Sequence, residues 1–231
     1  MRDQIIRETF VQLDKHLRQS SIAQIGGFRP PTDPCSSRFG GPLLGLPSEE
    51  WPACEGVPLS GLIQIRTDDL PHRPAALDGV ALLTVFLNER KLPVSTTTNG
   101  EGWLLREYST LDGLVPLSPP PIASRIKPFP IQWHSKTSEG PNWEDAWAVT
   151  DLSALNSLPD AAELFYSRYT NHNFTKVGGW PALIQSGLGG DGDFIFQVAS
   201  EEKPNFMVGD NGKCYFSKSS SGIWNMQWQC Y

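Results

Sequence analysis

The chain lacks the features that mark membrane-spanning, secreted and zinc-binding proteins. No apolar stretch of about 18 residues occurs, so the sequence predicts no membrane span. Asp3 and Glu8 interrupt the segment where a signal peptide would need a continuous apolar run. None of the four cysteines lies in a Cys-x-x-Cys pair or beside a histidine at zinc-ligand spacing. We therefore expect a cytoplasmic protein with reduced thiols, no metal and no cofactor.

The chain also lacks a surplus of positive charge, because its formal net charge is −6. A protein that follows nucleic-acid phosphates needs a basic face, so we expect no nucleic-acid partner and no membrane partner. The negative balance suits a basic protein partner, since opposite charges speed encounter, although solubility alone also explains it. The oligomeric state is left open.

No motif in the chain specifies a catalytic reaction. The nearest cluster of titratable residues joins His72 to Asp68 and Asp69, but it lies in a proline-rich connection typical of a solvated turn. Residues 190–193 resemble the start of a calcium loop, yet Ile195 stands where an oxygen ligand is required. We expect no catalytic residues and no metal ligands.

The chain is rich in turn-forming residues, with 20 prolines and 21 glycines, which is typical of β-rich folds. Strands are predicted over 62–65, 81–87, 103–108, 194–198, 213–217 and 224–231. The spacing of Ile6, Phe10, Leu13 and Leu17 predicts a surface helix over 3–19 that docks on the sheet. A short helix is predicted after Asp160, with that residue as its N-cap.

Similar landmarks occur in both halves of the chain. Gln64 and Gln197 lie 133 positions apart, and so do Gly79 and Gly212. Each half also holds a Gly-Gly pair that suits a tight corner before a strand. This pattern predicts an α+β fold of two similar β-rich units (an internal duplication) with mostly antiparallel sheets, an N-terminal helix and a few short helices.

The same landmarks set the expected domain organisation. Residues 1–117 form the helix and first unit, 118–130 a stiff proline-rich connection, and 131–231 the second unit. We expect the two units to form one compact domain.

Several segments of the second half carry a resemblance to a known family. They are KVGGWP at 176–181, FQV at 196–198, GKCYF at 212–216, and the tryptophans and closing WQCY of 224–231. In order and spacing they resemble the YwqG-like family of uncharacterised bacterial proteins. The resemblance is clearest over 170–231, looser over 35–110, and does not extend to 131–160.

The resemblance implies a mixed α/β protein with internal two-fold character and extensive antiparallel sheet. It implies no established reaction and no catalytic residues. Because members of the family occur among candidate immunity proteins of bacterial toxin systems, it also implies a toxin-neutralising role.

The segment without resemblance holds the candidate binding residues. Trp133, Trp143 and Trp147 occur there with Glu144 and Asp145. Tryptophan is enriched at the centres of protein interfaces, and flanking acids suit a basic partner. Taken singly, each tryptophan is more typical of the core of the second unit than of an interface. Our hypothesis is that these five residues bind a protein.

The functional hypothesis is a protein-binding protein, specifically a bacterial immunity protein that covers a toxin domain with a basic surface. One alternative is a hydrolase-type enzyme with its site in a cleft between the two units. Another is a regulatory binding module without a toxin partner.

Overall fold

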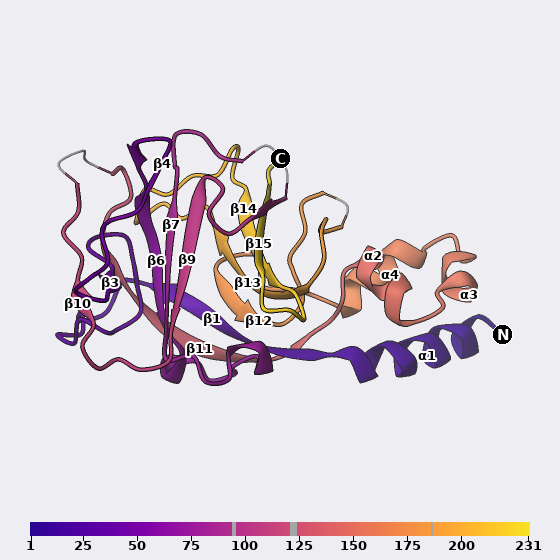
Figure 1. Ribbon diagram of the computed structural model, residues 1–231. Coiled ribbons are helices and arrows are strands. Elements are labelled where there is room, and N and C mark those ends of the chain that lie inside the picture. Colours follow the sequence, from indigo (N-terminus) through magenta and orange to yellow (C-terminus); the bar gives the residue numbers. More distant parts are fainter. Residues whose placement is uncertain (94–95, 121–123, 186) are drawn as a thin grey trace.

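The computed structural model describes residues 1–93, 96–120, 124–185 and 187–231, and its main element is one antiparallel sheet curved into a half-barrel (Figure 1). Within these ranges the sheet has 11 strands, in the order β8-β15-β14-β13-β12-β1-β11-β2-β6-β7-β9. These strands are β1 (Arg18–Ile25), β2 (Arg38–Phe39), β6 (Ser60–Arg66), β7 (Leu82–Leu87), β8 (Thr97–Thr98), β9 (Trp103–Tyr108), β11 (Phe129–Glu139), β12 (Lys176–Gly178), β13 (Asp193–Ala199), β14 (Lys213–Lys218) and β15 (Trp224–Gln229).

The remaining elements are short. Two small two-stranded sheets pair β3 (Leu44–Gly45) with β10 (Val115–Pro116) and β4 (Ala53–Cys54) with β5 (Val57–Pro58). The helices are α1 (Arg2–Leu13), α2 (Trp143–Val149), α3 (Ser153–Asn156) and α4 (Ala161–Arg168), with 3-10 turns η1 (Asp14–His16), η2 (Thr67–Asp69) and η3 (Ala75–Leu77). No helix in the described ranges has the length and apolarity to cross a membrane.

The centre of the sheet is the long antiparallel pair of β1 and β11, in which Gln24 lies opposite Gln132. From β11 the sheet continues through β2, β6, β7 and β9, which we call the first arm. From β1 it continues through β12, β13, β14 and β15, the second arm. Each arm therefore begins beside a central strand that comes from the other half of the chain.

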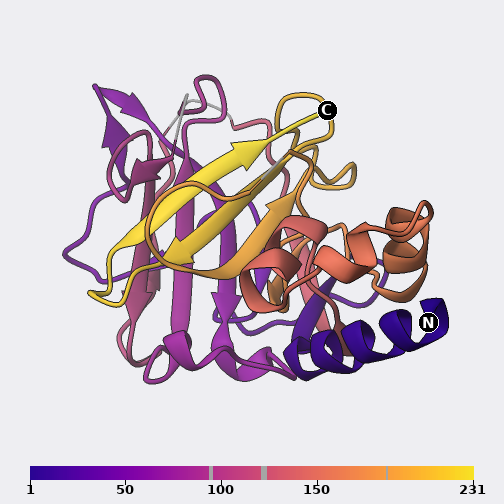
Figure 2. The same ribbon diagram turned by 90° about the vertical axis from the view of Figure 1, so that its right-hand side faces the viewer.

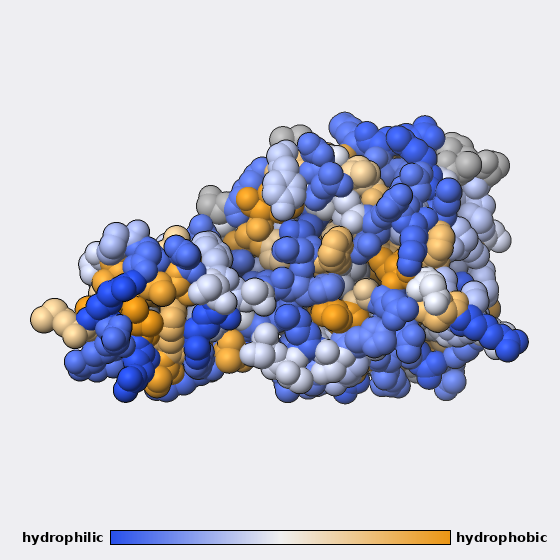
Figure 3. Space-filling model, turned by 180° about the vertical axis from the view of Figure 1, so that it is seen from behind, coloured by the Kyte–Doolittle hydropathy of each residue, from blue (hydrophilic) through white to orange (hydrophobic). Residues whose placement is uncertain are grey.

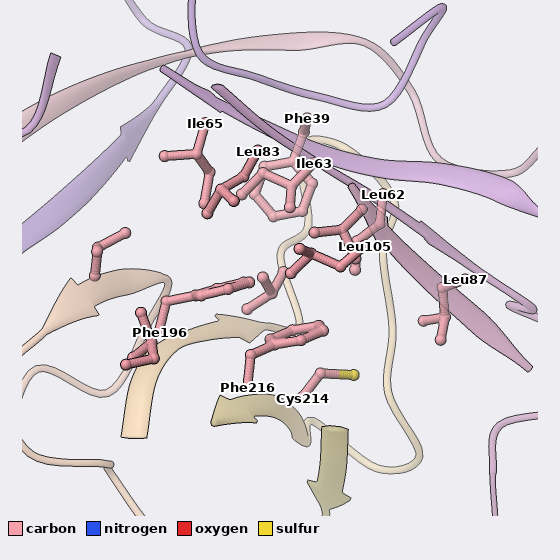
Figure 4. Close-up of a cluster of buried hydrophobic side chains, with 14 of the residues drawn as sticks. Phe39, Leu62, Ile63, Ile65, Leu83, Leu87, Leu105, Phe196, Cys214 and Phe216 are labelled. Carbon is pink, nitrogen blue, oxygen red and sulfur yellow. The ribbon is translucent and has the colours of Figure 1, made fainter. Parts of the chain in front are cut away.

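The two arms face each other across one hydrophobic core (Figure 2). Side chains from both arms point into it, among them Leu83 and Leu105 from the first and Phe196 and Phe216 from the second (Figure 4). The Phe196 and Phe216 rings stack with centroids 4.3 Å apart. Apolar burial of this kind is the main favourable term in folding, so packing between the arms stabilises the curved sheet.

Strand β7 is apolar along its whole length because both of its faces are covered. All six of its residues are buried. Leu83 and Val85 face the core between the arms, whereas Leu82 and Phe86 pack in separate clusters under the loops outside the first arm. A continuous apolar run, rather than alternation, is the pattern expected for a strand buried on both sides.

A segment between β7 and β9 ties the edges of the two arms together. Strand β8 adds to β15, with Thr98 opposite Asn225. Nearby, Glu107 of β9 accepts hydrogen bonds from Lys218 Nζ at 2.6 Å and from Trp224 Nε1 at 3.1 Å. These contacts join strands at the outer ends of both arms.

Gln64 in the first arm and Gln197 in the second occupy matching environments. Both are fully buried; each side-chain oxygen accepts one backbone N–H, and each amide donates to two backbone carbonyls. The partners are Leu44, Pro34 and Ser36 for Gln64, and Ala182, His172 and Phe174 for Gln197. Each glutamine thereby fastens the two chain segments that flank a Gly-Gly corner.

A hydroxyl beside each glutamine repeats this match. In both arms the hydroxyl accepts a backbone N–H from the long strand and donates to a carboxylate after that strand, at 2.9 Å and 3.0 Å. The three residues are Ser37, Arg66 and Asp69 in the first arm, and Thr175, Ala199 and Glu201 in the second. The two arms thus use the same local solution to satisfy buried polar groups.

The structure confirms the predicted strands and corrects the N-terminal helix. The strand over 103–108 has the predicted bounds, and the other five predicted strands differ by a few residues at their ends. The helix predicted over 3–19 ends at Leu13, because the chain becomes extended at Leu17 and enters β1. Strand β1 was not predicted, since its alternation of buried and exposed residues is weak.

The helix also docks elsewhere than predicted. Instead of lying on the sheet, α1 packs with α2, α3 and α4 in a cluster at one end of the sheet (Figures 1 and 2). Phe10 and Leu13 of α1 are buried there against residues such as Leu155 and Phe165. We call α1 to α4 the helical protrusion.

The helix predicted after Asp160 is present as α4, with Asp160 at its N-cap position, but the expected capping hydrogen bond is absent. The Asp160 side chain makes no capping hydrogen bond and pairs instead with Arg2 of α1. The proline-rich connection predicted over 118–130 includes residues 121–123, which lie outside the described residues; its end already belongs to β11.

We expect Gln64→Leu and Gln197→Leu each to lower the free energy of unfolding by about 3 kcal/mol, because each leaves a buried N–H and two carbonyls without partners. Urea unfolding measures the effect. Gln132→Leu is the control, since that side chain is exposed on β11 and should change stability by less than about 0.5 kcal/mol. A cost below about 1 kcal/mol at either buried position would contradict the assigned role.

Candidate protein-binding surface

The five residues predicted to bind a partner lie in two separate places. Trp143, Glu144, Asp145 and Trp147 all belong to α2 in the helical protrusion. Trp133 lies in the central strand β11, where it is 6% exposed and packs in the core between the arms. Trp133 is therefore a core residue and not an exposed anchor, because the opposing arm covers the face of the sheet to which it points.

Aromatic rings from α2 and α4 form a connected group on the helical protrusion. Trp143 lies edge-on to Phe165, with centroids 5.0 Å apart, and to Trp147 at 6.4 Å. Tyr166 follows at 5.4 Å from Phe165. Phe165 is buried and Trp143 half-buried, whereas Trp147 and Tyr166 are 40% and 53% exposed. The inner rings hold the outer two in place.

The surface around these rings is acidic. Residues 142–167 carry five acidic side chains and no lysine, arginine or histidine. Glu144 and Glu163 are exposed, and the Glu144 carboxylate lies within electrostatic reach of Tyr166. Partial burial, and then that carboxylate, raise the pKa of Tyr166 above its ordinary value. An anchor patch of rigid aromatic rings beside carboxylates is suited to a basic protein surface.

We use the name α2–α4 surface for Trp143, Glu144, Trp147, Glu163 and Tyr166. The protrusion that carries it stands apart from the body of the molecule, and hydrophobic residues gather on it among hydrophilic ones (Figure 3). The sequence pattern indicated the α2 residues but missed Tyr166 and Glu163. One feature of the sequence could have indicated them: residues 142–167 contain acidic but no basic side chains, and this stretch continues past the tryptophans into α4.

Asp145 faces the junction with the sheet instead of the α2–α4 surface. Its carboxylate accepts a hydrogen bond from Asn142 Nδ2 at 2.9 Å, and the same amide contacts the Pro181 carbonyl. Burial raises the pKa of Asp145, an effect that the Asn142 hydrogen bond and the charge of Arg18 oppose. Asp145 helps to seat α2 and is poorly placed to meet a partner.

A buried carboxylate contacts both ends of the segment between β11 and β12, which contains α2 to α4. We call this segment the excursion. Glu139 ends β11 just before the excursion, and it is fully buried. Its Oε1 accepts the backbone N–H of His172, where the chain returns, at 2.7 Å. Its Oε2 accepts Lys176 Nζ at 2.7 Å and the Trp180 N–H at 3.3 Å. One side chain therefore joins the departing strand to the returning one.

Lys176 is as deeply buried as Glu139, and the two form an ion pair closed to solvent. Burial lowers the pKa of Lys176 to about 8, against the opposing effect of the Glu139 charge. Each charge depends on the other, because an unpaired charge in the interior is strongly destabilising.

Close packing also closes the base of the protrusion. A side-chain carbon at Gly140 would lie 2.3 Å from the Tyr169 ring, so only glycine fits there. The Tyr169 hydroxyl donates to Asp14 Oδ1 at 2.8 Å, and Arg168 pairs with the same carboxylate at 2.5 Å. The end of α4 is thus fixed to the turn that follows α1.

In the described part of the chain, the groups considered for chemistry lie apart from one another. His72 Nε2 lies 2.6 Å from Ser135 Oγ, but in the described ranges no carboxylate is hydrogen-bonded to the other ring nitrogen. Burial raises the pKa of Cys214 to about 12, so its thiol is a poor nucleophile. All four cysteines are free, and the described residues contain no cluster of His, Cys, Asp and Glu placed to hold a metal ion.

These features define an antiparallel half-barrel protein with a helical protrusion that presents an aromatic and acidic surface. The chain belongs to the family described as Domain of unknown function (DUF1963), whose model matches residues 37–229. The match includes 131–160, the segment for which the resemblance noted above gave no correspondence. No curated protein matches the chain.

We expect Glu139→Gln to lower the free energy of unfolding by about 3–5 kcal/mol, because it leaves the Lys176 ammonium buried without a counter-charge. Lys176→Met should be similarly costly, since it strands the carboxylate. In the double variant neither charge is left alone, so its cost should fall short of the sum by at least about 2 kcal/mol. Urea unfolding of all three variants measures this coupling, and additive costs would contradict it.

Trp143→Ala should destabilise the protein by about 3 kcal/mol, because its ring packs on buried Phe165. Trp147→Ala should change stability by less than about 1 kcal/mol, since Trp147 is 40% exposed and lies at the outside of the group. Thermal and urea unfolding compare the pair. Equal losses of stability in the two variants would contradict the view that Trp143 supports the surface and Trp147 is exposed on it.

Proposed function

We propose that this chain is a cytoplasmic protein-binding protein, and specifically an immunity protein that neutralises a bacterial toxin by direct binding. The observation that carries the proposal is the α2–α4 surface, where exposed Trp147 and Tyr166 lie among carboxylates. Such a surface fits a toxin domain with a basic face. Binding over that face would block it without any reaction by this chain.

The way the surface is supported favours a binding role. Its rings rest on buried Phe165, and the excursion that carries it is held at both ends by Glu139. Rigid display of this kind lowers the entropic cost of association. The resemblance of 176–181 and 212–216 to the YwqG-like family, some of whose members are candidate immunity proteins, points in the same direction.

The enzyme alternative receives less support. Its site was expected in a cleft between the two units. Core side chains pack between the arms (Figure 4), and in the hollow that both units line the described residues give His72 no hydrogen-bonded carboxylate. A regulatory binding module without a toxin would use the same α2–α4 surface, and the identity of the partner separates it from an immunity protein.

We also propose that the two arms derive from an internal duplication. The matching hydrogen bonds of Gln64 and Gln197 support this, as do those of Ser37 and Thr175. The units proposed from sequence, 1–117 and 131–231 with a connection at 118–130, then exchange their central strands, because β1 joins the second arm and β11 the first. A superposition of the two arms that puts the two glutamines at unrelated positions would contradict the duplication.

The test uses the product of the neighbouring gene. If that gene encodes a multi-domain toxin, its toxic domain should bind the purified chain, and co-expression should restore growth. Trp147→Ala with Tyr166→Ala should weaken binding at least about 30-fold, which corresponds to the energy of an interface hot spot. The melting temperature should change little, because both rings are exposed.

Two matched controls make the result specific. Tyr231→Ala removes an aromatic ring that is 80% exposed at the C-terminus, away from the protrusion (Figure 1), and should leave binding unchanged. Glu144→Gln with Glu163→Gln should slow association and reduce its dependence on salt. Full protection by a folded Trp147→Ala/Tyr166→Ala variant would move the interface elsewhere, and protection without binding would reject neutralisation by contact.

A further inference from the structure

A polar hollow of about 470 Å³ lies where the two arms meet the base of the helical protrusion. Its walls come from the start of β1, the loop between η2 and η3, the end of β12 and the start of β13. The residues that matter most are Arg18, His72, Arg73, Gly178, Gly179 and Phe194. We call this hollow the arginine pocket. Its size is in the range of small-molecule sites.

Arg18 is held in place by stacking and not by an ion pair. Its guanidinium carbon lies 3.5 Å from the centre of the Trp180 ring. Trp180 is itself 6% exposed and fixed, because its Nε1 donates to the His16 carbonyl at 2.8 Å and its backbone N–H to Glu139. The guanidinium therefore has a rigid support on one face.

The donors of Arg18 are left without a protein acceptor. Within the described ranges, its side chain makes no hydrogen bond and has no carboxylate within 4.0 Å. Burial lowers the pKa of Arg18, and the more distant charges of Asp193 and Asp145 oppose this effect, so the group stays cationic. Arg18 is exposed to solvent at the mouth of the hollow, so its guanidinium offers up to five N–H donors to a ligand.

Arg73 brings a second guanidinium to the same hollow. It forms ion pairs with Asp68 and Asp78, whose carboxylate oxygens lie 3.6 and 3.7 Å from its nitrogens, but it makes no hydrogen bond to either one. The loop that carries it is fastened to β1, because the Ser21 hydroxyl donates to the His72 carbonyl and accepts the His72 N–H, both at 2.9 Å. The second cation is therefore also held by a fixed segment.

The glycine corner allows this loop to approach closely. Gly178 has φ of +76°, which favours glycine, and a side-chain carbon there would lie 3.5 Å from the Pro74 ring and 3.0 Å from the Gln19 carbonyl. The walls of the pocket are thus set by the fold before any ligand arrives. Preorganised cationic donors of this kind match phosphate and carboxylate groups well.

We propose that the arginine pocket binds a small anionic molecule through a phosphate or carboxylate group held between Arg18 and Arg73. Phe194 supplies an apolar wall for the rest of the molecule. The site is independent of the α2–α4 surface, and its occupant need not be the protein partner. Neither arginine was singled out from the sequence, because residues 18, 73 and 178 meet only in the folded chain.

The test is calorimetric titration of the full chain, at low ionic strength, with inorganic phosphate, pyrophosphate and succinate. Phosphate or pyrophosphate binding assigns a phosphoryl group, and tighter succinate binding assigns a carboxylate. Arg18→Met keeps an apolar stem on Trp180 and should weaken binding at least tenfold. Arg73→Met should have a similar effect. Arg18→Lys keeps the charge but loses the planar donors, so we expect a smaller loss of at least threefold.

Arg7→Met is the matched control, because Arg7 is exposed on α1 and its loss changes net charge equally. It should alter affinity by less than twofold. Unchanged melting temperatures show that the variants are folded, and either arginine can carry the test if the other variant is unstable. Absence of binding to every probe, or an equal loss in Arg7→Met, would overturn the proposal.

Discussion

The buried ion pair of Glu139 and Lys176 is the constraint on which the arrangement of sheet and protrusion depends. Its carboxylate also accepts the backbone N–H groups of His172 and Trp180. Those contacts close the excursion of α2 to α4, fix the corner after β12 and position the indole that supports Arg18. Removing water from both charges is expensive and offsets much of their attraction, whereas the loss of one partner would leave the other charge buried and unpaired.

The molecule consists of a rigid sheet and a helical protrusion that exposes aromatic rings. The two arms bury one continuous core, and β8 joins their edges, so the sheet offers little freedom to move. The protrusion has its own small core and exposes rings at its outside. Binding surfaces are commonly displayed in this way, on segments that a rigid scaffold positions. The scaffold can then be kept while the displayed residues change.

Local patterns in the sequence predicted the local parts of this structure. The strand over 103–108 has the predicted ends, and the Gln64 and Gln197 landmarks mark matched environments. Residues whose role depends on distant segments were misjudged. Leu17 continues a helical spacing, but the chain there must turn to place β1 between β11 and β12. In the sequence Trp133 resembles an interface residue, but the opposite arm covers it in the fold. No local pattern around Glu139 predicts its pairing with a lysine 37 positions away.

The position of β1 and β11 at the centre of the sheet has a consequence for how the chain is made. While a ribosome has released only the first half, the first arm lacks β11, and β1 has neither of its neighbours. Both strands would then present unpaired edges, which are sites of unwanted association. Pairing between strands so far apart in sequence is also slow to form. The fold should therefore be completed after synthesis, and two fragments divided near residue 125 should regain it only by reassociating.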